Sequence, residues 1–142
     1  MKGTLEISVV ALTLALATAG VPQAQQTDSP PSAATIEHGS YLVQHVAMCI
    51  QCHTPRDSDG NLIPSLLLHG EAIPVRSPFP HVEWGVRAPH IAGLPGYTVE
   101  QGVRLLTEGI TASGGKPKPP MPPFRMTRED AEAVVAYLKS LD

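Results

Sequence analysis

Five consecutive residues, Cys49-Ile50-Gln51-Cys52-His53, constrain this chain more than any other feature. Cys-x-x-Cys-His is the pattern that attaches haem covalently. One helical turn separates the two thiols, so both can form thioethers with the vinyl groups along one edge of a porphyrin. The imidazole of the next residue then lies beside the iron and can bind it as the proximal ligand. The chain has two cysteines, and the motif uses both. We therefore predict one covalently bound haem c with its iron.

Three other interpretations of the motif remain open from the residues alone. The cysteines could form a disulfide in an oxidising compartment. A thioredoxin-like pair expects a strand before the motif and a helix after it, whereas here a helical pattern leads into the motif and Pro55 follows it. A tetrahedral zinc site needs two further ligands at suitable spacing. The loop histidines that could serve, His69, His81 and His90, show no paired spacing.

The composition of the chain provides few large side chains for a hydrophobic core, and a haem would complete that core. Aromatic residues make up only 4% of the chain, which also contains 15 prolines and 12 glycines. Few large side chains are therefore available for a core, and a flat apolar cofactor supplies the missing volume. With 142 residues the chain has room for one domain. A formal charge of -3 does not indicate a nucleic-acid partner.

The N-terminal residues have the pattern of an export signal. Lys2 is followed by an apolar run over residues 7–19, which ends in small residues suited to cleavage. We expect a signal peptide at residues 1–24 with cleavage between 19 and 25, a disordered linker at 25–34, and one folded domain at 35–142. The alternative is an uncleaved anchor, but the run is shorter than the roughly 20 residues of a spanning helix. We expect a periplasmic or otherwise exported protein without stable membrane insertion after cleavage.

Apolar residues at three- and four-residue spacings predict three helices in this domain. Thr98 is a good N-cap with Gln101 in the reciprocal capping position, and Gly109 can close the same helix. Thr127 is the N-cap of the last helix. Between the first two helices, residues 54–97 form a long Pro- and Gly-rich loop in which no regular strand is evident. The predicted helices span residues 36 to 48 or 52, 98–109 and 127–141.

Several stretches together resemble the monohaem class I cytochrome c superfamily, and especially the small c-type cytochrome domains of bacterial dehydrogenase and oxidase chains. The resemblance implies an all-α, cytochrome c-like fold, with three or more helices wrapped around one covalent haem. It also implies single-electron transfer by a carrier or an electron-transfer subunit, and no catalysis. The matching stretches are Gly39-Ser40-Tyr41-Leu42, residues 49–54, residues 88–97, Met121-Pro122-Pro123-Phe124 and residues 133–141.

The resemblance further implies that a methionine far downstream binds the iron opposite His53, and Met121 matches that position. The residues agree, because prolines on both sides fix the backbone and keep this loop out of a helix. A stiff loop can hold one thioether on the open face of the iron. The alternatives are Met126, beside the helix cap, an open site, or a histidine from the long loop. Met48 is expected in the core.

Other site residues follow from the resemblance. The carbonyl of Pro89 is expected to accept a hydrogen bond from His53, and Trp84 and Tyr97 are candidates to bind the haem propionates. Packing on the ring or core is the alternative role for both aromatic residues. The first and last helices are expected to cross near a glycine, with Gly39 and Tyr41 against Tyr137 and Leu138. Weaker propionate candidates are Arg56, Arg76 and Arg87.

The segment around Met121 is basic, since residues 110–128 contain no acid. A basic patch beside the haem edge would steer docking to an acidic redox partner; chance charges on a solvated loop are the alternative. The patch would consist of Lys116, Lys118, Arg125 and Arg128.

Two other functions remain possible from the sequence alone. A haem enzyme, such as a peroxidase-like subunit, needs an open iron position and distal acid–base groups, and the sequence contains no such constellation that we can identify. A gas-binding sensor needs a displaceable methionine. Adding carbon monoxide to the reduced protein separates both from an electron carrier.

Overall fold

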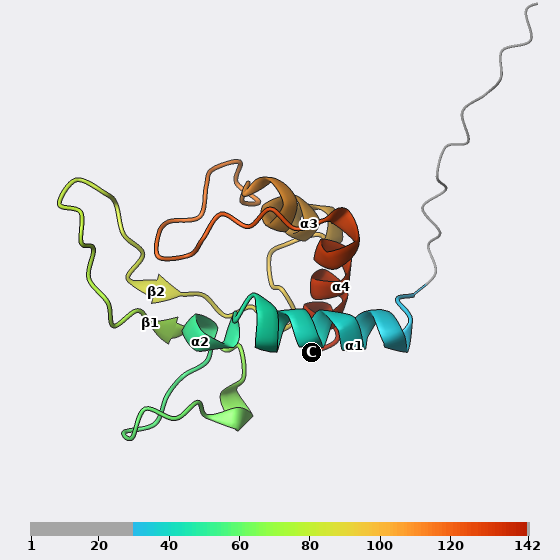
Figure 1. Cartoon of the computed structure of the whole chain (residues 1–142), viewed down its shortest axis with the longest axis horizontal. Coiled ribbons are helices and arrows are strands. Elements are labelled where there is room, and N and C mark those ends of the chain that lie inside the picture. Colours follow the sequence, from blue (N-terminus) through green and yellow to red (C-terminus); the bar gives the residue numbers. More distant parts are fainter. Residues whose placement is uncertain (1–29, 142) are drawn as a thin grey trace, which may run out of the picture.

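The computed structural model describes residues 30–141, so the expected signal peptide (1–24) and residues 25–29 of the expected linker lie outside the described residues. Figure 1 shows a mainly helical fold in which a small strand pair extends to one side. In chain order the elements are α1 (Ala33–Tyr41), a π-helical segment (Leu42–Val46), α2 (Ile50–His53), a 3-10 turn (Pro64–Leu66), β1 (Glu71–Ala72), β2 (Arg87–Ala88), α3 (Val99–Glu108) and α4 (Arg128–Lys139).

The first helix begins earlier than the sequence pattern indicated. Ser32 is its N-cap, and the Ser32 hydroxyl accepts a hydrogen bond from the Thr35 N–H at 3.1 Å. α1 therefore includes Ala33 and Ala34, which the sequence pattern assigned to the linker. Serine is a strong N-cap residue because its side chain satisfies one of the unpaired amides of the first turn.

The prediction that this helix continues to Met48 or Cys52 is wrong. From Leu42 the backbone forms a π-helical segment, in which the Ala47 N–H donates to the Leu42 carbonyl at 2.7 Å. Met48 then adopts a left-handed conformation, with a φ of 54°. A left-handed residue cannot continue a right-handed helix, so the attachment motif lies on a separate single turn, α2.

The two later helices are confirmed, with the caps that the sequence predicted. The Thr98 hydroxyl accepts from the Gln101 N–H at 3.2 Å, and the Gln101 side chain accepts from the Thr98 N–H at 3.0 Å. Gly109 ends α3 with a φ of 72°, a conformation that glycine adopts without steric cost. Thr127 begins α4, and its hydroxyl accepts from the Asp130 N–H at 3.1 Å.

The long segment after the motif contains regular structure that we did not predict, so the expectation of an all-α fold is wrong in this respect. β1 and β2 pair antiparallel, with Glu71 opposite Ala88 and Ala72 opposite Arg87. The intervening residues extend beyond the strands as one excursion (Figure 1). Each strand has only two residues, which is too short for the alternating pattern by which a strand is recognised in a sequence.

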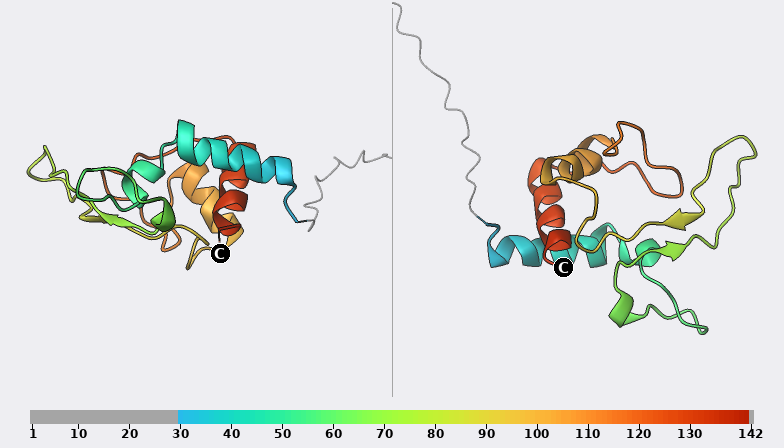
Figure 2. Two further views of the ribbon diagram at one scale, coloured as in Figure 1. Left: turned by 90° about the horizontal axis from the view of Figure 1, so that it is seen from below. Right: turned by 180° about the vertical axis from the view of Figure 1, so that it is seen from behind.

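α1 crosses α4, as the two further views in Figure 2 also show. Gly39 lies at this crossing, against Ala133 and Tyr137. Gly39 is buried, and a Cβ atom placed on it would lie 1.9 Å from the Ala133 carbonyl oxygen. The same Cβ would lie 2.9 Å from the Tyr137 Cβ, so the glycine permits the close contact. Tyr41, which we expected in this contact, is instead 56% exposed. The reason is its position two residues further along α1, where the side chain turns away from α4.

The protein core lies between α1, α3 and α4 and includes Leu68 from the long loop. Side chains of α3 and α4 face each other there, and Gly102 of α3 lies close to Val135 of α4. The aliphatic side chains that are almost completely buried are Val43, Leu68, Val103, Val134 and Val135. These residues fix the positions of the helices around the site.

Replacing Gly39 with alanine should strongly destabilise the protein. The added methyl group overlaps the Ala133 backbone, and overpacking of this kind costs about 1–3 kcal/mol or more. We expect a lower midpoint of urea unfolding for the Gly39→Ala variant of the holoprotein.

Gly115→Ala is the matched control, because its Cβ would have Thr111 Oγ1 as nearest atom, at an ordinary 3.6 Å. We expect its stability to stay within about 0.5 kcal/mol of the unmodified protein. Equal stabilities for the two variants would contradict the helix crossing described above.

Candidate functional site

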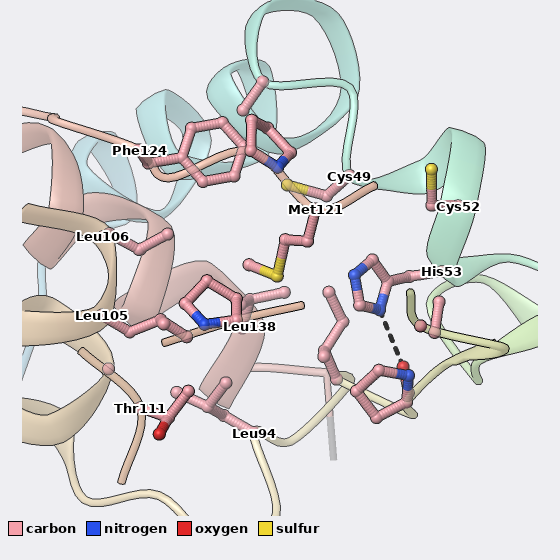
Figure 3. Close-up of a pocket in the computed structure, with 18 of the residues that line it drawn as sticks. Cys49, Cys52, His53, Leu94, Leu105, Leu106, Thr111, Met121, Phe124 and Leu138 are labelled. Atoms are coloured by element: carbon pink, nitrogen blue, oxygen red, sulfur yellow. Dashed lines mark hydrogen bonds between the residues drawn. The ribbon is translucent and has the colours of Figure 1, made fainter. Parts of the chain in front are cut away.

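A cavity of about 360 Å³ lies between the attachment motif, α3, α4 and the loop that precedes α4 (Figure 3). Its volume is that of a site for a bound organic molecule. The walls are mainly apolar and come from segments far apart in the sequence. They include Ile73, Ile91, Leu94, Leu105, Leu106, Phe124, Val134 and Leu138.

The attachment motif forms one edge of this cavity. Cys49, Cys52 and His53 all line it, because the single turn of α2 directs the three side chains to neighbouring positions. Both cysteines are free thiols, Cys49 partly buried and Cys52 exposed. Burial raises the pKa of the Cys49 thiol to about 11. This thiol is therefore protonated near neutral pH, and both sulfurs are available to form thioethers.

His53 is held in one orientation by a backbone acceptor. Its Nδ1 donates to the Pro89 carbonyl at 2.7 Å, which is the contact expected from the resemblance. A carbonyl only accepts, so the proton lies on Nδ1 and the lone pair lies on Nε2. Burial lowers the pKa of His53, which is only 8% exposed. The imidazole is therefore neutral near pH 7, the form that binds a metal.

Met121 lies across the cavity from this histidine. Figure 3 shows its sulfur pointing into the cavity, toward the His53 ring. Pro120 and Pro122 flank it and also line the cavity. The Met121 N–H donates to the Lys118 carbonyl at 3.2 Å, which further fixes the loop. A thioether from a loop and an imidazole from α2, distant in sequence, thus face each other across the cavity.

The other two methionines near the site have different surroundings. Met126 is outside the cavity lining and packs against the core, and its N–H donates to the Leu106 carbonyl at 3.0 Å. Met48 lines the cavity but is 43% exposed, so its expected place in the core is wrong. The left-handed backbone at Met48 directs the side chain outward.

The two aromatic candidates for the propionates lie in different environments. Tyr97 lines the cavity. Trp84 is outside the lining, and its indole N–H donates to the Val75 carbonyl at 3.0 Å. Its donor is therefore used within the loop excursion between β1 and β2.

The three arginines considered as partners of the haem propionates also lie in different environments. Arg87 lines the cavity, while Arg76 does not. Arg56 donates to the Gln51 side chain at 2.6 Å and to the Gly60 carbonyl at 2.7 Å, outside the lining. Among the histidines considered as alternative ligands, His90 lines the cavity, whereas His69 and His81 do not.

Sequence reasoning missed several residues that form the far wall. Leu94, Leu105 and Phe124 line the cavity, and we singled out none of them as site residues. Leu105 lies beside Leu106 in the apolar pattern of α3. This pair of leucines could have indicated that one face of the helix lines a site. Leu94 has a φ of 50°, a conformation that the sequence does not reveal in a leucine.

The comparison with known protein families agrees with this geometry. Residues 36–142 match the family model described as Cytochrome c. This chain belongs to the cytochrome c family.

A curated relative points to the same family. The chain is 33% identical over 140 residues to the fructose dehydrogenase cytochrome subunit of Gluconobacter japonicus. The alignment covers 93% of this chain and 27% of that protein. The chain therefore spans about a quarter of the length of the relative it matches.

The cofactor of a cytochrome c is covalently bound haem c with its iron, and the residues present fit it. The two thiols at one edge match the two thioether bonds, and the apolar walls match the porphyrin faces. Nε2 of His53 is the nitrogen that would bind the iron, and its orientation is set by the bond from Nδ1 to Pro89.

Removing either thiol should reduce haem attachment. We expect Cys49→Ala and Cys52→Ala to carry much less covalent haem, because each thiol makes one of the two bonds. Extraction with acidified acetone should leave the red colour on the unmodified protein. Release of the colour into the acetone would contradict covalent attachment.

Gln51→Ala is the matched control within the motif. Gln51 is exposed and its side chain contacts Arg56, so we expect haem attachment at the level of the unmodified protein. Loss of haem in this variant as well would mean that the motif fails by misfolding rather than by loss of a thiol.

Proposed function

We propose that this cytochrome c transfers single electrons through a haem iron bound by His53 and Met121, as a carrier or as an electron-transfer subunit. Haem c supplies an iron that takes up and releases one electron at a time. The observation that carries the proposal is the direction of two side chains. The Met121 sulfur and the His53 ring point toward each other across one cavity.

Two protein ligands favour electron transfer over the alternative functions. A peroxidase-like enzyme or a gas sensor needs one face of the iron to be open or easily opened. Here the loop that carries Met121 is stiffened by prolines at 117, 119, 120, 122 and 123. A stiff loop opposes displacement of the thioether, so the iron would stay closed to substrates.

The environment of His53 supports the same function. Its hydrogen bond to Pro89 keeps the ring in one orientation during a change of charge on the iron. The backbone carbonyl of His53 also accepts from the Gly70 N–H at 2.7 Å. A ligand held at both its ring and its backbone moves little, which is the requirement for fast electron transfer.

The route for electrons would pass the exposed edge of the motif. Cys52 is exposed while Cys49 is partly buried. A haem attached through both thiols therefore presents the edge near Cys52 to a docking partner.

The basic patch expected around Met121 is partly neutralised. Lys118 pairs with Glu83 at 2.5 Å, and Arg128 pairs with Glu100 and with Glu132, each at 3.0 Å. Within residues 30–141, no acidic side chain pairs with the other two members of the patch. We propose that docking to an acidic redox partner depends mainly on Lys116 and Arg125.

We further propose that the protein is exported and exchanges electrons with a dehydrogenase or with its acceptor. The signal-like N-terminal sequence supports export. The relative described above is a cytochrome subunit of a dehydrogenase, which supports the class of partner. In the described part of the chain, none of the helices has the length and apolar character of a membrane span.

Replacing Met121 with alanine should lower the reduction potential and open the iron to carbon monoxide. A thioether ligand favours the ferrous state, so its loss stabilises the ferric state. The weak far-red absorption band of the ferric protein, which arises from a sulfur–iron bond, should disappear. The measurements are absorption spectra and a redox titration of the purified holoprotein.

Met126→Ala is the matched control five residues away. Met126 packs against the core outside the cavity, so we expect the band, the potential and the carbon monoxide response to persist. Loss of the band in Met126→Ala and its survival in Met121→Ala would show that the wrong methionine is proposed. Absence of the band in the unmodified protein would favour a bis-histidine or an open site.

A further inference from the structure

Two histidines form a pair at the surface beside the haem cavity. The ring centroids of His69 and His90 lie 4.7 Å apart, with the ring planes at 70°. Both residues are exposed. The site described above does not use His69, and it uses His90 only as part of the cavity lining.

The backbone fixes these two residues opposite each other. β1 and β2 pair with Glu71 opposite Ala88, and the same register places His69 opposite His90. One step beyond the pair, the Ile91 N–H donates to the Leu68 carbonyl at 2.9 Å, which continues the register past the histidines. Side chains opposite each other on antiparallel segments lie close together.

Gly70 brings the two segments into tight contact at this point. A Cβ atom on Gly70 would lie 2.7 Å from the His90 backbone nitrogen and 2.8 Å from the Ala88 carbonyl oxygen. Leu68, which precedes His69, is completely buried. Its N–H donates to the buried Thr54 hydroxyl at 3.0 Å. The backbone segments that carry the two histidines are therefore held together by packing and hydrogen bonds, which keeps the two residues side by side.

The separation of the rings suits a shared metal ion. A metal lies about 2.0–2.1 Å from a ligating imidazole nitrogen, and hence about 3.2 Å from the ring centre. Two rings bound to one ion at angles of roughly 90–110° then have centres about 4.5–5.2 Å apart. The observed separation of 4.7 Å lies within that range.

The ring nitrogens of this pair are also free of competing contacts. Across residues 30–141, the histidine rings that make hydrogen bonds are those of His38 and His53. We propose that His69 and His90 together form a binding site for a divalent transition-metal ion such as zinc, nickel or copper, separate from the haem iron. Imidazole is a preferred ligand of these ions, and water would complete the coordination.

The site also lies next to the residue that orients the proximal histidine. His90 follows Pro89, whose carbonyl accepts the hydrogen bond from His53. Added positive charge at this position disfavours the more positive ferric state of the iron. Metal binding is therefore expected to raise the reduction potential, a consequence that rests on the haem site but does not depend on Met121.

Zinc is the probe of choice because it does not exchange electrons with the haem. Titration of the ferrous holoprotein with Zn²⁺ in a calorimeter should show one site. His69→Gln and His90→Gln should each weaken zinc binding by about tenfold or more, since even the loss of an outer partner of a metal ligand costs 10–100-fold. His81→Gln, at an exposed histidine outside the pair, should leave the affinity unchanged.

Nuclear magnetic resonance of the unmodified ferrous protein provides a test that needs no variant. The ring signals of His69 and His90 should shift together as Zn²⁺ is added, and both shifts should reach their limit at the same Zn²⁺ concentration. Unchanged zinc affinity in either variant of the pair would overturn the proposal. A His90 ring that does not respond to zinc, because it is held by the haem, would also overturn it.

Discussion

The hydrogen bond from His53 Nδ1 to the Pro89 carbonyl joins two segments that are 36 residues apart in sequence. Around it, the Gly70 N–H donates to the His53 carbonyl and the Leu68 N–H donates to the Thr54 hydroxyl. The end of the attachment motif is thereby tied to both sides of the long loop. The orientation of the His53 imidazole depends on these bonds, because α2 is a single turn and has little stability of its own.

The haem cavity is continuous with the protein core. Leu106, Val134 and Leu138 belong to the buried core and also line the cavity. The cofactor would therefore pack on the same side chains that join α3 to α4. This continuity explains how a chain with 4% aromatic residues builds a stable domain, since the haem contributes the apolar surface that large side chains provide elsewhere.

The sequence identified the parts of the site that depend on local chemistry. Residues near one another in sequence define the attachment motif and the caps of α3 and α4. The glycine at the helix crossing was predictable because close packing of two helices is a physical reason for a glycine in a helix. The end of the first helical stretch, which comprises α1 and the π-helical segment after it, could not be predicted. It depends on a left-handed backbone at Met48, and the apolar pattern continues through that residue.

The features that the sequence did not reveal depend on contacts between distant residues. The strand pair is too short to leave a pattern and forms where the loop returns to the motif. Trp84 looked suited to a propionate, but the fold places its donor on the Val75 carbonyl. Lys118 and Arg128 looked like free charges, and tertiary structure pairs both with acids. Such pairings require knowledge of which segments meet in space.

The central claim is that the iron is held between the His53 imidazole and the Met121 thioether. X-ray absorption at the iron edge of the unmodified holoprotein tests this claim most directly, because it reports the atoms bound to the metal without a substitution or an added ligand. We predict one sulfur neighbour together with nitrogen neighbours in both the ferric and the ferrous protein. A shell of nitrogen or oxygen neighbours without sulfur would contradict the account.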